Sequence, residues 1–307
     1  MLGAEGSAVD RRHRLAAALA SGRLLRFPGA LNALSALLVE RAGFEGVYVS
    51  GAVVSASLGL PDIGLTTSSE VAAFTRQVSS VSRLPCLVDA DTGFGEPMNV
   101  ARTVQLLEEA GAAGCHLEDQ VLPKRCGHLS GKSLVPVVDM GRRLAAARAA
   151  RRDERFLLCA RTDARSVEGL EAALDRARAY VDAGAEMIFA EAVESAAEIE
   201  AFRRAVAVPL LVNMTEFGRS PLLDATALAS LGVNVVLYPV TLLRLAMGAI
   251  EQGLARLAAE GTQAGLVPAM QTRARLYEVV DYAAYNVFDD ALFNFDLPTG
   301  GGARPAS

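Results

Sequence analysis

Short apolar runs and longer segments of helical period alternate along the whole chain. Eight runs rich in β-branched and other apolar side chains have the length that is typical of buried strands. They cover residues 24–27, 46–49, 86–89, 114–117, 156–160, 186–190, 210–213 and 234–238. Between them, apolar residues recur at helical spacing over 31–42, 68–82, 99–110, 138–151, 168–183, 196–206, 225–231 and 242–260. The pattern predicts eight strand–helix units.

A weak internal repeat supports this count. Gly43, Gly111, Gly184 and Gly232 each follow a helical segment and shortly precede an apolar run. Glycine is the usual residue where a helix ends in the left-handed conformation and turns into a strand. Strict alternation of strand and helix predicts a parallel sheet, and eight units match a (β/α)8 barrel over about 24–260, within a single domain. A doubly wound sheet is the alternative, although no G-x-G-x-x-G follows the first strand.

The pattern changes beyond the eighth unit. A helical arm over about 266–295 contains Tyr277, Tyr282, Tyr285, Phe288, Phe293 and Phe295. Such an aromatic element packs either on a second subunit or on its own barrel. The tail, 298–307, is rich in Gly, Pro, Ala and Ser and is expected to be disordered. At the other end, residues 1–14 lack the apolar segment of a signal peptide and are interpreted as a short cytosolic lead-in.

Composition narrows the class of protein. The net charge of −5 leaves no basic surface suited to nucleic acid, and no apolar run is long enough to span a membrane. Four cysteines without C-x-x-C spacing favour a reducing cytoplasm. Only three histidines are present, so a metal site would have to rest on carboxylates.

Polar side chains follow the predicted strands, where a barrel carries its function. Asp89 and Asp91 lie on one side of an extended segment, and Glu118 ends the next strand. A lone aspartate at such a place is commonly a helix cap or turn residue, but several converging carboxylates favour Mg²⁺ or Mn²⁺. Arginine forks match substrate carboxylates, and Arg161, Arg244 and Arg273 are the candidates. For the last two, ordinary salt bridges are the alternative.

One cysteine differs from the rest. Cys86, Cys115 and Cys159 lie in apolar runs and are expected in the core. Cys126 instead lies between Lys124-Arg125 and His128. Neighbouring cations lower the pKa of a thiol, so Cys126 is a candidate nucleophile or acid–base group. An exposed basic loop with an incidental cysteine is the alternative.

Residues 124–129 (KRCGHL) resemble the signature of the isocitrate lyase and phosphoenolpyruvate mutase superfamily. Further segments resemble the branch of that superfamily that acts on a methylated isocitrate, over most of residues 24–295. They are 58–62 (LGLPD), 88–95 (VDADTGFG), 117–120 (LEDQ), 160–164 (ARTDA), 213–218 (NMTEFG) and 270–273 (MQTR).

The resemblance implies an activity and an assembly. It implies Mg²⁺-dependent cleavage of the tricarboxylate 2-methylisocitrate to pyruvate and succinate, the last step of the methylcitrate route of propionate breakdown. It also implies a cytoplasmic homotetramer in which the C-terminal helix is exchanged between subunits. Cleavage of isocitrate or 2,3-dimethylmalate is the near alternative, and a carboxyphosphonoenolpyruvate phosphonomutase is the more distant one.

The resemblance also assigns roles to residues. Asp89 and Asp91 resemble the metal-site aspartates with Glu118 in support, and Cys126 resembles the catalytic cysteine that protonates the succinate carbanion. Substrate contacts would come from Ser50, Gly51, Ala52, Asp62, Gly127, His128, Arg161, Glu191, Asn213, Thr215, Arg244 and Arg273. Tyr48, a phenol at a strand end, is the candidate general base, with a buried core tyrosine as the alternative. Two departures from the family pattern, 52–54 (AVV) and Ala190, bear on substrate shape.

Overall fold

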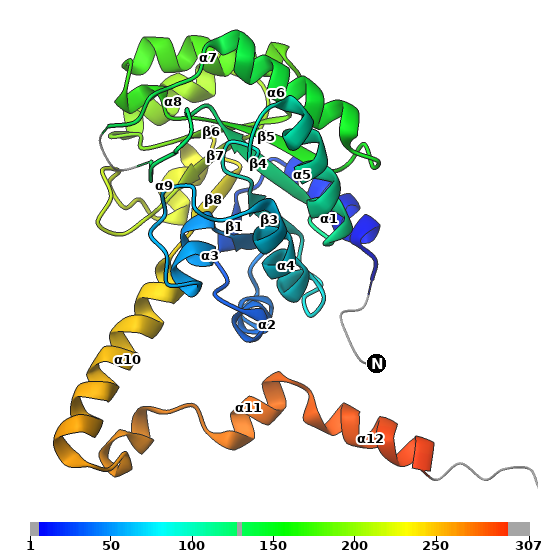
Figure 1. Cartoon of the computed structure of the whole chain (residues 1–307), viewed down its shortest axis with the longest axis vertical. Coiled ribbons are helices and arrows are strands. Elements are labelled where there is room, and N and C mark those ends of the chain that lie inside the picture. Colours follow the sequence, from blue (N-terminus) through cyan, green and yellow to red (C-terminus); the bar gives the residue numbers. More distant parts are fainter. Residues whose placement is uncertain (1–5, 128–130, 294–307) are drawn as a thin grey trace, which may run out of the picture.

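The computed structural model describes residues 6–127 and 131–293. Eight parallel strands form one sheet in the order β1-β8-β7-β6-β5-β4-β3-β2. They are β1 (Leu25–Pro28), β2 (Val47–Val49), β3 (Cys86–Asp89), β4 (Gly114–Glu118), β5 (Leu157–Thr162), β6 (Met187–Ala190), β7 (Leu210–Asn213) and β8 (Val235–Tyr238). The eight predicted strands are therefore all present, and the predicted (β/α)8 fold is confirmed (Figure 1).

The ring is nearly closed between β1 and β2. A single parallel bridge joins Gly29 to Tyr48, and the N–H of Ala30 donates to the carbonyl of Tyr48 at 2.9 Å. Gly29 is required at this seam, because a Cβ there would lie 2.1 Å from the carbonyl oxygen of Pro239. The seam therefore brings β8, β1 and β2 together beside Tyr48.

Helices cover the outside of the barrel (Figure 1). Those that follow the strands are α2 (Ala33–Arg41), α3 (Gly51–Ser57), α4 (Ser68–Ser79), α5 (Pro97–Glu109), α6 (Val137–Ala150), α7 (Leu170–Asp182), α8 (Ala196–Ala205), α9 (Ala225–Ser230) and α10 (Thr241–Glu260), with a 3₁₀ turn η1 (Ala164–Ser166). Helices on the barrel bury apolar side chains against it; on α5 these are Val100, Val104 and Leu107. Local caps set where helices begin, as at Thr67, which forms a capping box with Glu70.

Alternation along the strands separates two cores. Side chains such as Val47, Val88 and Leu117 point outward and pack in the outer core under the helices. Residues of the other parity, including Leu87, Phe189, Leu211 and Leu237, fill the interior of the barrel. Because successive strand residues point to opposite faces, Asp89 follows Leu87 into the interior, and Arg161 follows Cys159. The alternation along the strands thus directs the polar side chains at the strand ends toward the interior of the barrel.

A helix precedes the barrel where the sequence predicts only a lead-in. α1 (Ala8–Ala20) begins at Ser7, which forms a capping box with Asp10. Leu15 packs in the inner core, and the buried Arg12 donates to the carbonyl of Ala112 at 3.1 Å and pairs with Asp153 at 3.1 Å. The helix is hidden in the sequence because arginine stems supply part of the face that it buries.

The C-terminal region projects from the barrel (Figure 1). α10, which the sequence analysis assigns to the barrel, has no buried residue and extends away from it. It is followed by η2 (Ala264–Ala269), α11 (Arg273–Val279) and α12 (Tyr282–Phe293). α11 touches α2, where Arg41 donates to the carbonyl oxygens of Glu278 and Val279. Among the described residues, no helix has the combined length and apolar character that a membrane span requires.

Candidate active site

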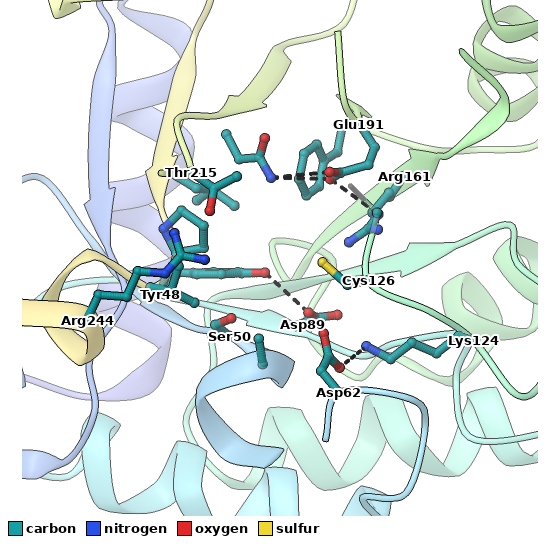
Figure 2. Close-up of a pocket in the computed structure, with 17 residues that line it drawn as sticks. Tyr48, Ser50, Asp62, Asp89, Lys124, Cys126, Arg161, Glu191, Thr215 and Arg244 are labelled. Carbon is teal, nitrogen blue, oxygen red and sulfur yellow. Dashed lines mark hydrogen bonds and ion pairs between the residues drawn. The ribbon is translucent and has the colours of Figure 1, made fainter. Parts of the chain in front are cut away.

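A cavity of about 570 Å³, open to solvent, lies at the carboxyl ends of the strands (Figure 2). It is lined by Tyr48, Ser50, Ala52, Asp62, Asp89, Lys124, Cys126, Gly127, Arg161, Phe189, Glu191, Asn213, Thr215, Leu237, Pro239, Val240 and Arg244. Apolar and charged groups both face this cavity. Its lining suits a small, highly charged molecule that carries an apolar group.

Three carboxylates form a cluster at one side of the cavity. Oxygens of Asp89, Asp91 and Glu118 lie within 4.8 Å of one another, and all three residues are buried. The N–H groups of Gly51 and Asp91 donate to Asp89 at 3.1 and 3.0 Å, which fixes that carboxylate. Both carboxylate oxygens of Glu118 are buried without a hydrogen-bond partner in the described structure. Crowded carboxylates with unused oxygens are the donor set that a hard divalent cation takes.

Electrostatics in the cluster reflect this crowding. Burial and the charge of Asp89 raise the pKa of Asp91 to about 6, and burial raises the pKa of Glu118 well above its usual value. Nζ of Lys124 lies 2.7 Å from Oδ1 of Asp91 and also binds Asp62 (Figure 2). Burial lowers the pKa of Lys124, but the surrounding carboxylates raise it by more than burial lowers it. The lysine is therefore charged. The carboxylates of the cluster can therefore accommodate a cation in addition to the charged Lys124.

Arg161 forms the centre of a second buried charge cluster. Its guanidinium pairs with Asp163 at 3.0 Å, Glu118 at 3.4 Å and Glu191 at 3.5 Å. The amide of Asn213 donates to Glu191 at 3.3 Å, and the ring of Phe189 lies 5.4 Å from the guanidinium carbon of Arg161. The carboxylates hold Arg161 toward the cavity in Figure 2, where its fork can bind a substrate carboxylate or a developing oxyanion.

Cys126 faces the same cavity from the loop that follows β4. It is partly exposed, whereas the other three cysteines are buried, as the sequence analysis predicts. Gly127 packs tightly behind it: a Cβ at this position would lie 2.5 Å from Nη2 of Arg161 and from the carboxyl carbon of Glu191. In Figure 2 the thiol points into the space between Asp89 and Arg161.

Tyr48 lines the cavity and is buried. Its hydroxyl is 2.8 Å from Nε2 of His116 and 3.4 Å from Oδ2 of Asp89. Burial and the charge of Asp89 raise the pKa of Tyr48 well above its usual value. Burial also lowers the pKa of His116 to about 4, so the imidazole is neutral at pH 7. The resting site therefore contains a neutral phenol beside a neutral imidazole.

Most residues that the sequence predicts for the site meet at this cavity. Gly51 adjoins it through its contact with Asp89, and Arg244 reaches it from α10 while paired with Glu216 at 2.9 Å. Arg273 does not: it is exposed at the start of α11 in the projecting region. His128 lies outside the described residues. Sequence reasoning treats Lys124 only as a cation near Cys126 and assigns no role to His116, although His116 shares the strand parity of Glu118.

A (β/α)8 barrel with an acidic cluster, a buried arginine and a loop cysteine at its strand ends has the architecture of an enzyme. The chain belongs to the phosphoenolpyruvate phosphomutase family, whose model matches residues 15–258.

Within that family the chain is similar to carbon–carbon lyases and, at lower sequence identity, to a hydrolase. It is 59% identical to the "probable 2-methylisocitrate lyase 2" of Corynebacterium glutamicum, over 96% of this chain and 97% of the relative. The crystal structure of a 2,3-dimethylmalate lyase superposes with a TM-score of 0.87 at 32% identity, covering 98% of this chain and all of that one. A phosphonopyruvate hydrolase solved with oxalate and Mg²⁺ has a TM-score of 0.84 at 31% identity, covering 92% and 99%.

Proposed function

We propose that this protein cleaves 2-methylisocitrate to pyruvate and succinate with a bound Mg²⁺, for which Mn²⁺ is the alternative ion. The observation that carries the proposal is the meeting of the acidic cluster, Arg161 and Cys126 at one cavity of a chain that closely matches a probable 2-methylisocitrate lyase. A retro-aldol cleavage needs all three. The metal at the acidic cluster would stabilise the charge on an oxygen, Arg161 would bind a substrate carboxylate, and Cys126 would donate a proton to carbon.

The metal would be held by Asp89 and Asp91, with Glu118 in support. The oxygens of Glu118, which accept no hydrogen bond in the described structure, and the mutual approach of the three carboxylates support this assignment. When bound, the ion supplies positive charge that stabilises the oxygen of the leaving 2-oxo acid. A relative of the same fold was solved with Mg²⁺ and oxalate, a dianion related in shape to such a product.

Tyr48 is the base of this proposal. A neutral phenol can accept the proton of the substrate's tertiary hydroxyl only if it gives up its own. Nε2 of His116, 2.8 Å away, is within reach to accept that proton. As the hydroxyl proton leaves, the carbon–carbon bond breaks, the carbonyl of pyruvate forms and the electron pair stays on the succinate carbon.

Cys126 then donates the thiol proton to that carbon, which yields succinate. Arg161 would hold a carboxylate of the substrate, with Ser50, Gly51, Ala52, Asp62, Gly127, His128, Glu191, Asn213, Thr215, Arg244 and Arg273 as the further proposed contacts. For Arg273, contact with the cavity would require a rearrangement or the arm of another subunit, because it is exposed on α11 of its own chain.

The substrate's methyl group would lie against Phe189, Leu237 and Pro239, which provide the apolar side of the cavity. One methyl group contributes only about 1–3 kcal/mol of discrimination, so we expect slow cleavage of isocitrate as well. The superposition with a 2,3-dimethylmalate lyase makes that diacid the second candidate substrate.

We also propose that the chain works as a cytoplasmic homotetramer that exchanges its C-terminal helix. Exposed apolar residues along the projecting region support this, among them Leu245, Leu254, Val287, Phe288 and Leu292. Burial of such a series on another subunit would be strongly favourable. Four free cysteines support a reducing compartment.

The deciding experiment is a product assay with purified protein and Mg²⁺. The three substrates 2-methylisocitrate, isocitrate and 2,3-dimethylmalate are supplied in parallel, and pyruvate, glyoxylate and propionate are quantified. Pyruvate from 2-methylisocitrate at the highest kcat/KM is expected. Faster formation of glyoxylate from isocitrate would reassign the substrate, and cleavage of none of the three would reject the class of reaction.

A further inference from the structure

The loop that carries Cys126 is closed at its base by backbone pairing. Gln120 and Leu134 form an antiparallel bridge. The N–H of Val121 donates to Ser133 at 2.8 Å, and that of Val135 donates to Asp119 at 2.9 Å. These bonds hold the two stems of the loop together, but they lie several residues from the thiol. Other contacts must therefore set the position of Cys126 itself.

One such contact comes from Gln120, whose side chain is buried. Its amide nitrogen donates to the carbonyl of Arg125 at 2.9 Å, and its amide oxygen accepts from the N–H of Arg125 at 2.9 Å. Both backbone groups of the residue before Cys126 are thus bound by a single side chain. Because Gln120 is separated from the end of β4 only by Asp119, this contact ties the loop to the barrel.

The matching contact comes from Lys132 on the other side of the thiol. Its Nζ binds the carbonyl of Gly127 and lies 2.9 Å from Oδ1 of Asp163. The side chain of Lys132 is 1% exposed and that of Asp163 is 0% exposed, so the pair is shielded from water. A buried ammonium that loses one of its two partners is costly, which favours keeping both.

Asp163 is a rigid anchor for this lysine. Its N–H donates to Asp119 at 2.9 Å, and its carboxylate also binds Arg161. Asp119 in turn accepts from Thr162 and Tyr180, each at 2.8 Å. Lys132 therefore connects the backbone beside the thiol to the carboxylate that orients Arg161.

We propose that Gln120 and Lys132 form a clamp that positions Cys126, with Gln120 holding the residue before the thiol and Lys132 the residue after it. Neither side chain lines the cavity, so both are positioning residues and not catalytic ones. The proposal rests on the proposed function in giving Cys126 the proton transfer to carbon. Its structural part, the placement of the thiol, does not depend on the identity of the substrate.

Kinetics of Gln120→Met and Lys132→Met test the clamp. A misplaced proton donor lowers kcat, by about 10- to 100-fold for a displacement on the scale of 1 Å, while KM changes by less than about twofold. Lys132→Arg keeps a cation for Asp163 and is expected to recover part of the loss. Arg151→Met is the matched control, because Arg151 also bridges a carbonyl (Phe156) and a carboxylate (Glu186), far from the cavity. Its kcat should stay near that of the wild type.

A double-mutant comparison separates positioning from general damage. If Lys132 acts through the thiol, Lys132→Met added to Cys126→Ser lowers kcat no further than Cys126→Ser alone. The same fold-loss in both backgrounds, or a kcat of Lys132→Met near that of the wild type, would overturn the proposal. Should Lys132→Met fail to fold, Gln120→Met decides, because it removes the amide that binds both backbone groups of Arg125 and keeps a side chain of similar length.

A measurement without substrate tests the clamp independently of the proposed function. Iodoacetamide is added to the native protein, and mass spectrometry identifies which cysteine is alkylated; the three buried thiols should stay unmodified. Faster alkylation of Cys126 alone in Lys132→Met than in the wild type and Arg151→Met supports the clamp. Equal rates would overturn it even if the lyase assay succeeds, and a failed lyase assay leaves this result intact.

Discussion

The hydroxyl of Tyr48 on β2 lies 2.8 Å from Nε2 of His116 on β4, and both side chains are shielded from water. Their rings stack with centroids 5.9 Å apart, and Phe189 contacts the imidazole edge-on at 5.2 Å. This packing limits rotation of both rings. It therefore holds the phenol oxygen at a defined place beside Asp89.

Removal of this hydroxyl tests its role as the base. Tyr48→Phe keeps the packing, and we expect it to lower kcat by about 10²- to 10⁴-fold, the usual contribution of a positioned acid–base group. The rate of pyruvate formation and a thermal melt give the two readouts. Tyr238→Phe, at the end of β8 but outside the cavity lining, should retain activity. Near-normal turnover in folded Tyr48→Phe would exclude the phenol as base.

Cys126→Ser tests the proton donor of the reaction. The hydroxyl of serine is a much weaker acid than a thiol, so we expect loss of most turnover with the fold and the affinity for Mg²⁺ retained. Pyruvate formation and the Mg²⁺-dependent melting temperature are measured together. The control is Cys86→Ser, whose side chain packs in the outer core, and which should affect stability more than kcat. Substantial activity in Cys126→Ser would contradict the assignment.

Gly127→Ala tests the close approach of the loop to Arg161. The added Cβ would lie 2.5 Å from two groups of Arg161 and Glu191, so the loop or both side chains must move. A shift of about 1 Å can cost 10²-fold in rate, and we expect a loss in kcat/KM of that order. Gly141→Ala is the matched control: its new Cβ meets nothing nearer than 3.7 Å, in the helix α6. That variant should be as active as the wild type; equal activity of Gly127→Ala would show that the loop adapts.

Metal dependence follows from the acidic cluster. Chelation is expected to abolish turnover, and Mg²⁺ should restore it. Glu118→Gln removes one charge at constant volume and should raise the Mg²⁺ concentration for half-maximal activity by about 10- to 100-fold. Because a ligand that binds the folded state stabilises it, the rise in melting temperature with Mg²⁺ should shrink in parallel. Glu109→Gln, on the surface of α5, is the control; an unchanged Mg²⁺ requirement in Glu118→Gln would exclude that carboxylate from the site.

Assembly should depend on the apolar face of the projecting region. Phe288, which is 45% exposed in the single chain, is expected to lie buried between subunits, so Phe288→Asp should give a smaller particle in light scattering. Met98→Asp changes an exposed apolar residue on the barrel and should leave the mass unchanged. A wild-type protein that is monomeric throughout would reject the exchanged helix.

The sequence by itself determined the barrel and much of the site. Parallel strands are covered on both faces, so they appear as apolar runs that end abruptly at polar groups such as Asp89 and Glu118. Motif resemblance then assigned a role to Cys126, which local pattern alone left open. Helix α1 was missed because arginine stems, not apolar residues, form part of its buried face.

Only the tertiary structure decided which polar groups meet. His116 lies within an apolar run, and its pairing with Tyr48 depends on two strands that are not neighbours in the sequence. Arg273 matches a family motif, yet α11 places it outside the cavity of its own chain. Lys132 resembles any loop lysine until the fold brings Asp163 to its ammonium. Spacing along the chain encodes periodicity and parity, whereas contacts between distant segments arise only when the barrel closes.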